Sequence, residues 1–169
     1  MLIITFSFTT EHFHLQPDTN DGHFTPRYHN LTTQQRMANP TSSLLVFLPG
    51  EGEIRQLQRD LAPRLPTDVV VSPLFGNLDL ETQRQAIQPA PRGQRKIVLA
   101  TNIAESSLTI EGVSVVIDSG LERRARFDPN TAMSRLQTGR ISQASAAQRA
   151  GRAGRLAAGI CYRLWSEDQ

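Results

Sequence analysis

The sequence predicts a doubly wound α/β domain, with a mainly parallel sheet and helices on both of its faces. Two observations carry this prediction. Short continuous apolar runs such as LLVFL (44–48) and KIVLA (96–100) lack the alternation that marks a half-exposed strand. Segments with apolar residues at helical spacing separate these runs, so the order strand, helix, strand repeats along the chain.

The regular elements begin at Ser43. Residues 44–48 predict a first strand, and residues 53–62 predict a helix because their apolar residues fall on one face. A second strand is expected at 69–71 and a second helix at 79–87. Further strands are expected at 96–100, 113–118 and 159–165, with a polar loop over 101–112 and a helix that starts near 141 and carries the arginines up to 155.

One segment breaks this order. LERRARFDPNTAMSRLQ (121–137) has two polar-apolar stretches around the turn residues Asp128-Pro129-Asn130. This pattern predicts an antiparallel β-hairpin that projects from the sheet. Its surface would be crowded by Arg123, Arg124, Arg126 and Arg135, either as a contact for nucleic acid or as a solvated hairpin.

Residues 1–42 differ from the rest, and we expect them to form an irregular N-terminal appendage to a domain at 43–169. They contain all four histidines of the chain, at 12, 14, 23 and 29. No cysteine or third well-spaced ligand accompanies His12 and His14, so we expect no metal site.

The composition restricts the partners and the compartment. Residues 84–163 contain thirteen basic residues and five acidic ones, which indicates a polyanion as the partner of this half. The single cysteine, Cys161, excludes an internal disulfide and is typical of a reducing compartment. No apolar run reaches the roughly 20 residues that span a membrane. We therefore expect a cytoplasmic protein with no membrane partner.

Ligands of parallel α/β sheets bind at the carboxyl ends of the strands. Pro49-Gly50 follows the first predicted strand, Phe75-Gly76 follows the second, and TNIAESSLTIEG (101–112) follows the third. The small hydroxyl and amide side chains of this last loop suit phosphates and riboses. GEGEIR (50–55) lacks the third glycine of a dinucleotide fingerprint, so an oxidoreductase is disfavoured.

QRAGRAGR (148–155) places Arg149, Arg152 and Arg155 three residues apart with only alanine and glycine between them. On a helix, residues three apart are neighbours, and the small residues would let this basic face approach another surface closely. Such a face suits a triphosphate, whose developing charge arginines can neutralise. A solvated basic helix or a general phosphate-backbone patch remains the alternative.

Four of these stretches, in this order, resemble motifs of superfamily-two helicases of the DEAH/RHA group, and in particular the bacterial HrpB-type helicases. LLVFLPGEGEI is similar to motif IV, PLFGNLDLETQ to motif IVa, ATNIAESSLTIEG to motif V and QRAGRAGR to motif VI. The resemblance covers residues 43–166 and implies the second RecA-like domain of such a helicase.

The resemblance implies roles for individual residues. Arg152 and Arg155 match the arginine fingers that reach the γ-phosphate, and Gln148 matches a glutamine that orders the attacking water. Ser107, Glu111 and Arg149 match nucleotide-binding positions, and Ile87 occupies a position where many relatives have an aromatic residue against the base. The implied nucleic-acid contacts are Thr101, Asn102, Thr109, Gly50, Gly76, Arg123 and Arg124, the last two on the hairpin implicated in strand separation.

The chain lacks two parts of an ATPase site. It contains neither the G-x-x-x-x-G-K-[ST] loop that cradles phosphates nor the DEAH tetrapeptide. The resemblance therefore implies a C-terminal motor domain whose ATP and Mg²⁺ are bound mainly by a P-loop RecA-like domain in cis, with single-stranded RNA or DNA as partner. We expect no ATPase activity from this chain alone. The alternative is a non-catalytic module that binds nucleic acid or protein.

Overall fold

A computed structural model describes residues 4–7, 12–15, 43–106, 108–129, 132–153, 155 and 159–165. Its centre is a five-stranded sheet in the order β4-β5-β3-β6-β9, and every neighbouring pair is parallel. The strands are β3 (Ser43–Phe47), β4 (Val69–Leu74), β5 (Arg95–Ala100), β6 (Val113–Asp118) and β9 (Ile160–Arg163). The predicted α/β class with a parallel sheet is confirmed.

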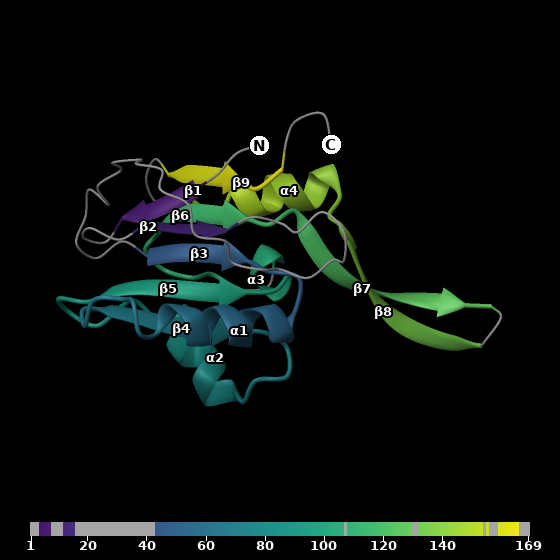
Figure 1. The fold of residues 1–169 in the computed structure, drawn as a ribbon, viewed down its shortest axis with the longest axis horizontal. Helices are drawn as coiled ribbons and strands as arrows, with labels where there is room; N and C mark the ends of the chain where they lie inside the picture. Colours follow the sequence, from purple (N-terminus) through teal and green to yellow (C-terminus); the bar gives the residue numbers. More distant parts are fainter. Residues whose placement is uncertain are drawn as a thin grey trace.

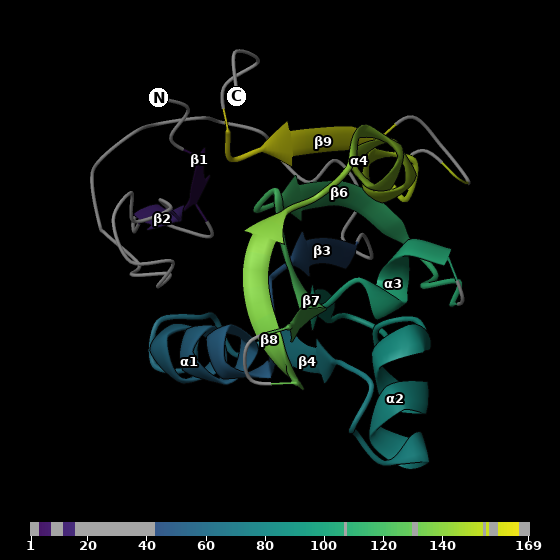
Figure 2. The same ribbon diagram turned by 90° about the vertical axis from the view of Figure 1, so that its right-hand side faces the viewer.

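Helices cover both faces of this sheet, as Figure 2 shows. Helix α1 (Glu51–Leu61) lies on one face, and α2 (Leu80–Ile87), α3 (Ile103–Ser106) and α4 (Gln143–Ala150) lie on the other. Asp79 and Ser142 cap α2 and α4, because their side chains accept hydrogen bonds from the backbone N–H of Thr82 and Ser145. The turn residues at the helix starts therefore place the helices as the sequence predicts.

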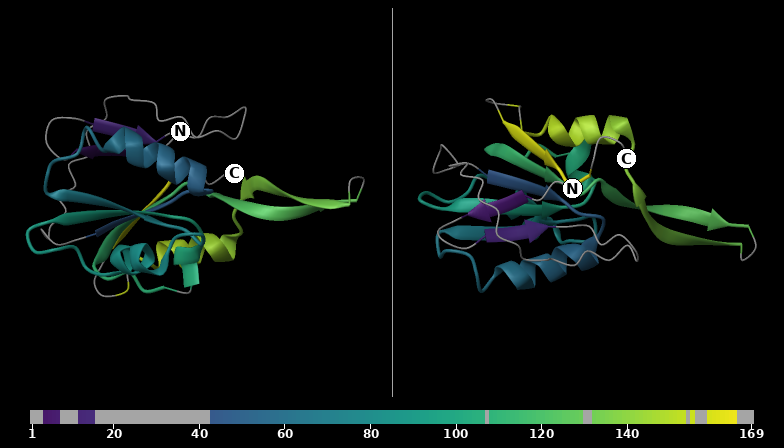
Figure 3. Two further views of the ribbon diagram at one scale, coloured as in Figure 1. Left: turned by 90° about the horizontal axis from the view of Figure 1, so that it is seen from below. Right: turned by 45° about the horizontal axis from the view of Figure 1, so that its top comes forward.

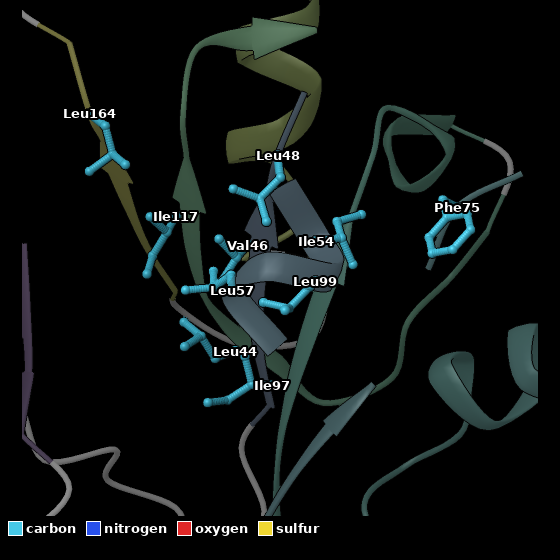
Figure 4. Packing of buried hydrophobic residues seen from close by; sticks show 10 residues of the cluster. All are labelled: Leu44, Val46, Leu48, Ile54, Leu57, Phe75, Ile97, Leu99, Ile117 and Leu164. Atoms are coloured by element: carbon cyan, nitrogen blue, oxygen red, sulfur yellow. The ribbon is translucent and has the colours of Figure 1, made fainter. Parts of the chain in front are cut away.

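The continuous apolar strands are explained by two separate cores. One cluster joins β3, β5 and β6 to α1 through residues such as Val46, Leu99 and Ile54, all of them buried (Figure 4). A second cluster on the opposite face joins the alternate strand residues, including Phe47 and Val98, to α2 and α3. Since both faces of each central strand are covered, both sets of side chains are apolar.

A long antiparallel hairpin leaves the sheet after β6. It consists of β7 (Leu121–Asp128) and β8 (Met133–Arg140) and extends away from the body of the molecule (Figures 1 and 3). The predicted hairpin is confirmed, and it ends three residues later than the expected 137. Its two strands pair over their full length, which the alternating sequence alone did not define.

Two expectations about local structure were wrong. The loop 101–112 contains a short helix, α3, whose four residues are Ile103–Ser106. The last helix does not continue to Arg155, because α4 ends at Ala150 and Gly151 is its C-cap. Only Arg149 of the three arginines is therefore on the helix, and Arg152 lies in the turn that follows. The glycines that lower helix stability account for this early end.

Two short strands precede the domain. β1 (Ile4–Ser7) and β2 (His12–Leu15) pair with one another in antiparallel register. His23 and His29 lie outside the described residues. A domain boundary after residue 42 stays a prediction. None of the helices in the described part of the chain has both the length and the apolar character needed to cross a bilayer.

Lys96, the only lysine of the chain, binds the carboxyl end of helix α2. Its side chain is 2% exposed, and its ammonium group donates to the carbonyls of Ala86 (2.9 Å) and Gln88 at the end of α2. A cation here satisfies carbonyls that a helix end leaves without partners. Burial lowers the pKa of this ammonium to about 8, which the charge of Glu111 opposes.

Candidate functional site

The carboxyl ends of the parallel strands gather three of the predicted segments at one edge of the sheet. Gly50 follows β3, Gly76 follows β4, and the segment with Thr101 and Asn102 follows β5. Gly76 and Asn102 are exposed, and Thr101 is half-buried. Ser107 lies outside the described residues.

Arg149 is fully buried at this edge, with a side chain that is 0% exposed. Its Nε donates to Glu105 Oε1 at 2.7 Å, and its Nη1 donates to Asp118 Oδ1 at 2.8 Å. The guanidinium also lies 4.8 Å from the centre of the Phe47 ring. Since a buried cation is tolerated when it is paired, the two carboxylates make this position possible.

Asp118 is equally buried and holds the end of β6 to the chain that follows. Its Oδ1 accepts from the backbone N–H of Gly120 at 2.9 Å as well as from Arg149. Burial raises the pKa of the Asp118 carboxyl, whereas the adjacent Arg149 charge favours its ionised form. Direct contact of Arg149 with a nucleotide would require its guanidinium to leave these partners.

Arg152 and Arg155 also face the segment after β5. Arg152 is 4% exposed, and its guanidinium donates to the carbonyls of Glu105 (3.0 Å) and Leu108 (2.7 Å). Burial lowers the pKa of Arg152, with the charge of Arg155 acting in the same direction. Arg155 is exposed and donates to Thr109 Oγ1 at 2.9 Å. The three arginines thus contact Glu105, Leu108 and Thr109 of the segment after β5.

Glu111 lies elsewhere on the molecule. The segment that leaves the carboxyl end of β5 returns to the amino end of the sheet, where Ser43 N–H donates to Gly112 O at 2.7 Å. There the backbone N–H of Glu111 donates to Ile87 O at 3.4 Å. The structure thus places Glu111 beside Ile87 at the end of α2, apart from the arginines.

A second group joins the hairpin to α1. The Arg123 side chain crosses Gly50, where an added Cβ would lie 2.9 Å from Arg123 Cδ, and its Nη2 donates to Glu53 at 2.8 Å. Arg124 pairs with Glu122 on the same strand. Gly50 and Arg123, both predicted to contact nucleic acid, are therefore direct neighbours. Gln148 is exposed on α4.

The carboxylates that hold these arginines were not predicted from the sequence: Glu53, Glu105 and Asp118. Asp118 could have been found, because an acidic residue at the end of an otherwise apolar strand must pair with a cation once it is buried. Within the described ranges, no group of three His, Cys, Asp or Glu side chains is arranged to hold a metal ion.

Comparison with known proteins shows which family the chain belongs to. The family model described as "Helicase conserved C-terminal domain" matches residues 25–157. The chain is 55% identical over 139 residues to the ATP-dependent RNA helicase HrpB of Escherichia coli K12. The matched region covers 82% of this chain and 17% of that protein. It is 41% identical over 138 residues to human ATP-dependent RNA helicase DHX33, covering 78% of this chain and 20% of that protein.

The solved structures agree with the sequence comparison. The crystal structure of the Escherichia coli DEAH/RHA helicase HrpB has a TM-score of 0.72 and 59% sequence identity, and the match covers 76% of this chain and 16% of that one. The chain spans less than a quarter of the length of each of these relatives. It belongs to the helicase conserved C-terminal domain family, with the fold of the corresponding domain of DEAH/RHA helicases.

Proposed function

We propose that this chain acts as the C-terminal motor domain of an ATP-dependent nucleic-acid helicase. The observation that carries the proposal is the convergence of Arg149, Arg152 and Arg155 on the segment 105–109 at the carboxyl edge of a parallel sheet. Ligands of such sheets bind at this edge. The relatives named HrpB and DHX33 are ATP-dependent RNA helicases, which makes single-stranded RNA the preferred substrate over DNA.

Arg155 is the side chain best placed to act as an arginine finger. Its guanidinium is exposed and donates to the hydroxyl of Thr109, a group that it can exchange for a phosphate oxygen. Arg152, the second proposed finger, would have to exchange two backbone carbonyls for phosphate oxygens. The charge of either arginine at the γ-phosphate would stabilise the transition state of phosphoryl transfer. Gln148, exposed on the preceding helix, would order the attacking water.

The other implied nucleotide positions lie at the end of α2, apart from the arginines but on the side of the sheet that α4 also covers. Glu111, proposed to lie next to the ribose, is in backbone contact with Ile87, which stands where many relatives have an aromatic residue against the base. The β- and γ-phosphates and Mg²⁺ would be bound mainly by a P-loop domain in cis, because those functions need the phosphate loop and the metal-binding carboxylates of that domain. Closure of the two domains on ATP would complete the site.

The nucleic-acid contacts would occupy the neighbouring surface. Thr101, Asn102, Ser107 and Thr109 offer uncharged donors for a phosphate backbone, and Gly50 and Gly76 allow it to approach closely. Arg123 and Arg124 at the base of the hairpin would add charge.

The experiment that tests this function compares ATP hydrolysis by the chain alone and by the chain joined to the P-loop domain of an HrpB-type helicase. We expect phosphate release near background from the chain alone and turnover stimulated by single-stranded RNA from the two-domain protein. A two-domain protein whose P-loop lysine is changed to alanine is the control. Hydrolysis by the isolated chain, or none by the folded two-domain protein, would contradict the proposal.

A further inference from the structure

Arg149 connects two parts of the molecule that the proposed function treats separately. Its Nε binds the Glu105 carboxylate on α3, in the segment that faces the nucleotide. Its Nη1 binds Asp118 at the end of β6 and also the carbonyl of Leu121, at 3.2 Å, the first residue of the hairpin. A planar guanidinium presents its donors in a rigid fork, so the positions of these three partners are linked.

Both strands of the hairpin are attached at the point that Arg149 contacts. Gly120 lies between β6 and β7, and its N–H shares Asp118 Oδ1 with Arg149. The Gly120 carbonyl accepts from the N–H of Ile141, the residue directly after β8, at 3.0 Å. A shift of the Asp118 carboxylate therefore acts on the beginning of β7 and on the end of β8 together.

The nucleotide-facing segment is equally constrained on its other side. Arg152 binds the carbonyls of Glu105 and Leu108, and Arg155 binds the hydroxyl of Thr109. If either arginine turns toward a phosphate, the segment 105–109 loses a hydrogen-bond partner. A resulting shift of Glu105 would move the carboxylate that Arg149 binds. The Phe47 ring lies against the Arg149 guanidinium, 4.8 Å from its centre, and both side chains are fully buried.

We propose that Arg149 is a positioning residue that couples the ATP-facing segment 105–109 to the orientation of the β7–β8 hairpin. The proposal rests on the function proposed above. It assigns Arg149 to the transmission of the nucleotide signal through Glu105, Asp118 and Leu121, in place of a contact with the nucleotide itself. Loss of the Arg149 guanidinium would uncouple ATP hydrolysis from strand separation.

The test measures the number of base pairs separated per ATP hydrolysed by the complete two-domain helicase. Strand displacement and phosphate release are followed on the same RNA duplex with a single-stranded overhang. Arg149→Lys retains the positive charge but cannot hold three partners at once. We expect the ratio of base pairs separated to ATP hydrolysed to fall at least five-fold, and we expect Arg59→Lys, on the exposed side of α1, to retain it.

The ratio distinguishes coupling from a purely structural role, which would lower hydrolysis and strand separation together. A ratio for Arg149→Lys within two-fold of the unmodified protein would overturn the proposal. If Arg149→Lys does not fold, Asp118→Asn is measured in its place. Asparagine keeps the side-chain volume of Asp118 and an oxygen that accepts from the Gly120 N–H. The same five-fold and two-fold limits on the ratio apply. An unmodified two-domain protein without ATP hydrolysis would instead contradict the proposed function, on which this coupling depends.

Discussion

At the scale of single residues, three arginines of identical spacing have three different surroundings. Arg149 is 0% exposed between two carboxylates, Arg152 is 4% exposed against backbone carbonyls, and Arg155 is exposed. Burial makes the first two expensive to move, because a buried cation that leaves its partners loses compensation for its desolvation. Arg155 is thus the arginine with the lowest cost of reaching a phosphate.

Removal of the Arg155 guanidinium should mainly affect the chemical step. For Arg155→Ala in the two-domain protein we expect kcat for ATP hydrolysis to fall by about 10³-fold, as loss of an arginine finger does in other phosphoryl-transfer enzymes. Steady-state phosphate release measures this effect. Arg59→Ala is the control for loss of a surface charge, and a kcat for Arg155→Ala within a few-fold of normal would exclude the finger role.

Lys96 should make the stability of the domain depend on pH in alkaline solution. Its pKa is about 8 in the folded chain, below the ordinary value of 10.5, so between these values the unfolded chain binds more protons. The free energy of unfolding therefore gains a contribution that increases with pH from about 8 to 10.5. Below pH 8 this contribution is at its minimum, since both states are then protonated.

Urea unfolding at several pH values measures this contribution. Lys96→Met lacks the titrating group but keeps the Cys161 thiol, whose pKa burial raises to about 11. The difference in unfolding free energy between the unmodified chain and Lys96→Met thus isolates Lys96. We expect this difference to move in favour of the unmodified chain as the pH rises from 8 to 10, and a constant difference would contradict the assignment.

At the scale of elements, the direction of the hairpin is determined at its base. Gly120 has φ +73, and an added Cβ would lie 2.6 Å from Trp165 Cε3. This close approach brings the hairpin base next to the segment that follows β9. The pairs Arg123–Glu53 and Arg149–Leu121 connect the hairpin to α1 and α4. An isolated two-stranded hairpin is only marginally stable in water, so the contacts at its base are needed to hold it in one orientation.

Gly120→Ala should therefore destabilise the domain. Left-handed backbone strain and the clash with Trp165 together predict a loss of about 2 kcal/mol or more in the free energy of unfolding. Urea denaturation of the purified chain measures the loss. Gly139→Ala is the matched control within the same hairpin, because an added Cβ there meets nothing within 4 Å. Equal stability of the two variants would contradict the importance of the hairpin base.

The elements themselves were largely predictable from sequence. Apolar runs without alternation located every strand of the central sheet, and Asp128-Pro129-Asn130 located the hairpin turn. The end of α4 was not predicted, because the arginines keep helical spacing beyond Gly151, where the low helix propensity of glycine ends the helix. The helix α3 was missed because its four residues are too few to show a helical period.

At the scale of the whole molecule, positive charge is concentrated on the parts that surround the carboxyl edge of the sheet. The hairpin exposes Arg123, Arg124 and Arg126, and the segment after α4 exposes Arg155. Charges of this kind bind a phosphate backbone by releasing its counterions. The arrangement therefore predicts binding of single-stranded nucleic acid that weakens as salt increases.

Single-strand affinity at several salt concentrations measures the number of phosphate contacts. We expect a negative slope of log affinity against log salt for the purified chain, and we expect Arg124→Gln to reduce its magnitude by about 0.7, the value for one phosphate contact with a single strand. Arg59→Gln should leave the slope unchanged. A flat slope for the unmodified chain would favour the alternative of a module that binds protein.

The sequence by itself determined the class of fold, the order of its elements and the segments that form the candidate site, because these depend on local apolar patterns and on short motifs. Only the tertiary structure decided the burial and the partners of each arginine. The burial of Arg149 depends on Glu105, Asp118 and Phe47, which are distant in the chain and meet only when the parallel strands align. The spacing of arginines along the sequence shows which side chains are available. The free energy of moving a charged side chain depends on the groups that surround it in the folded protein.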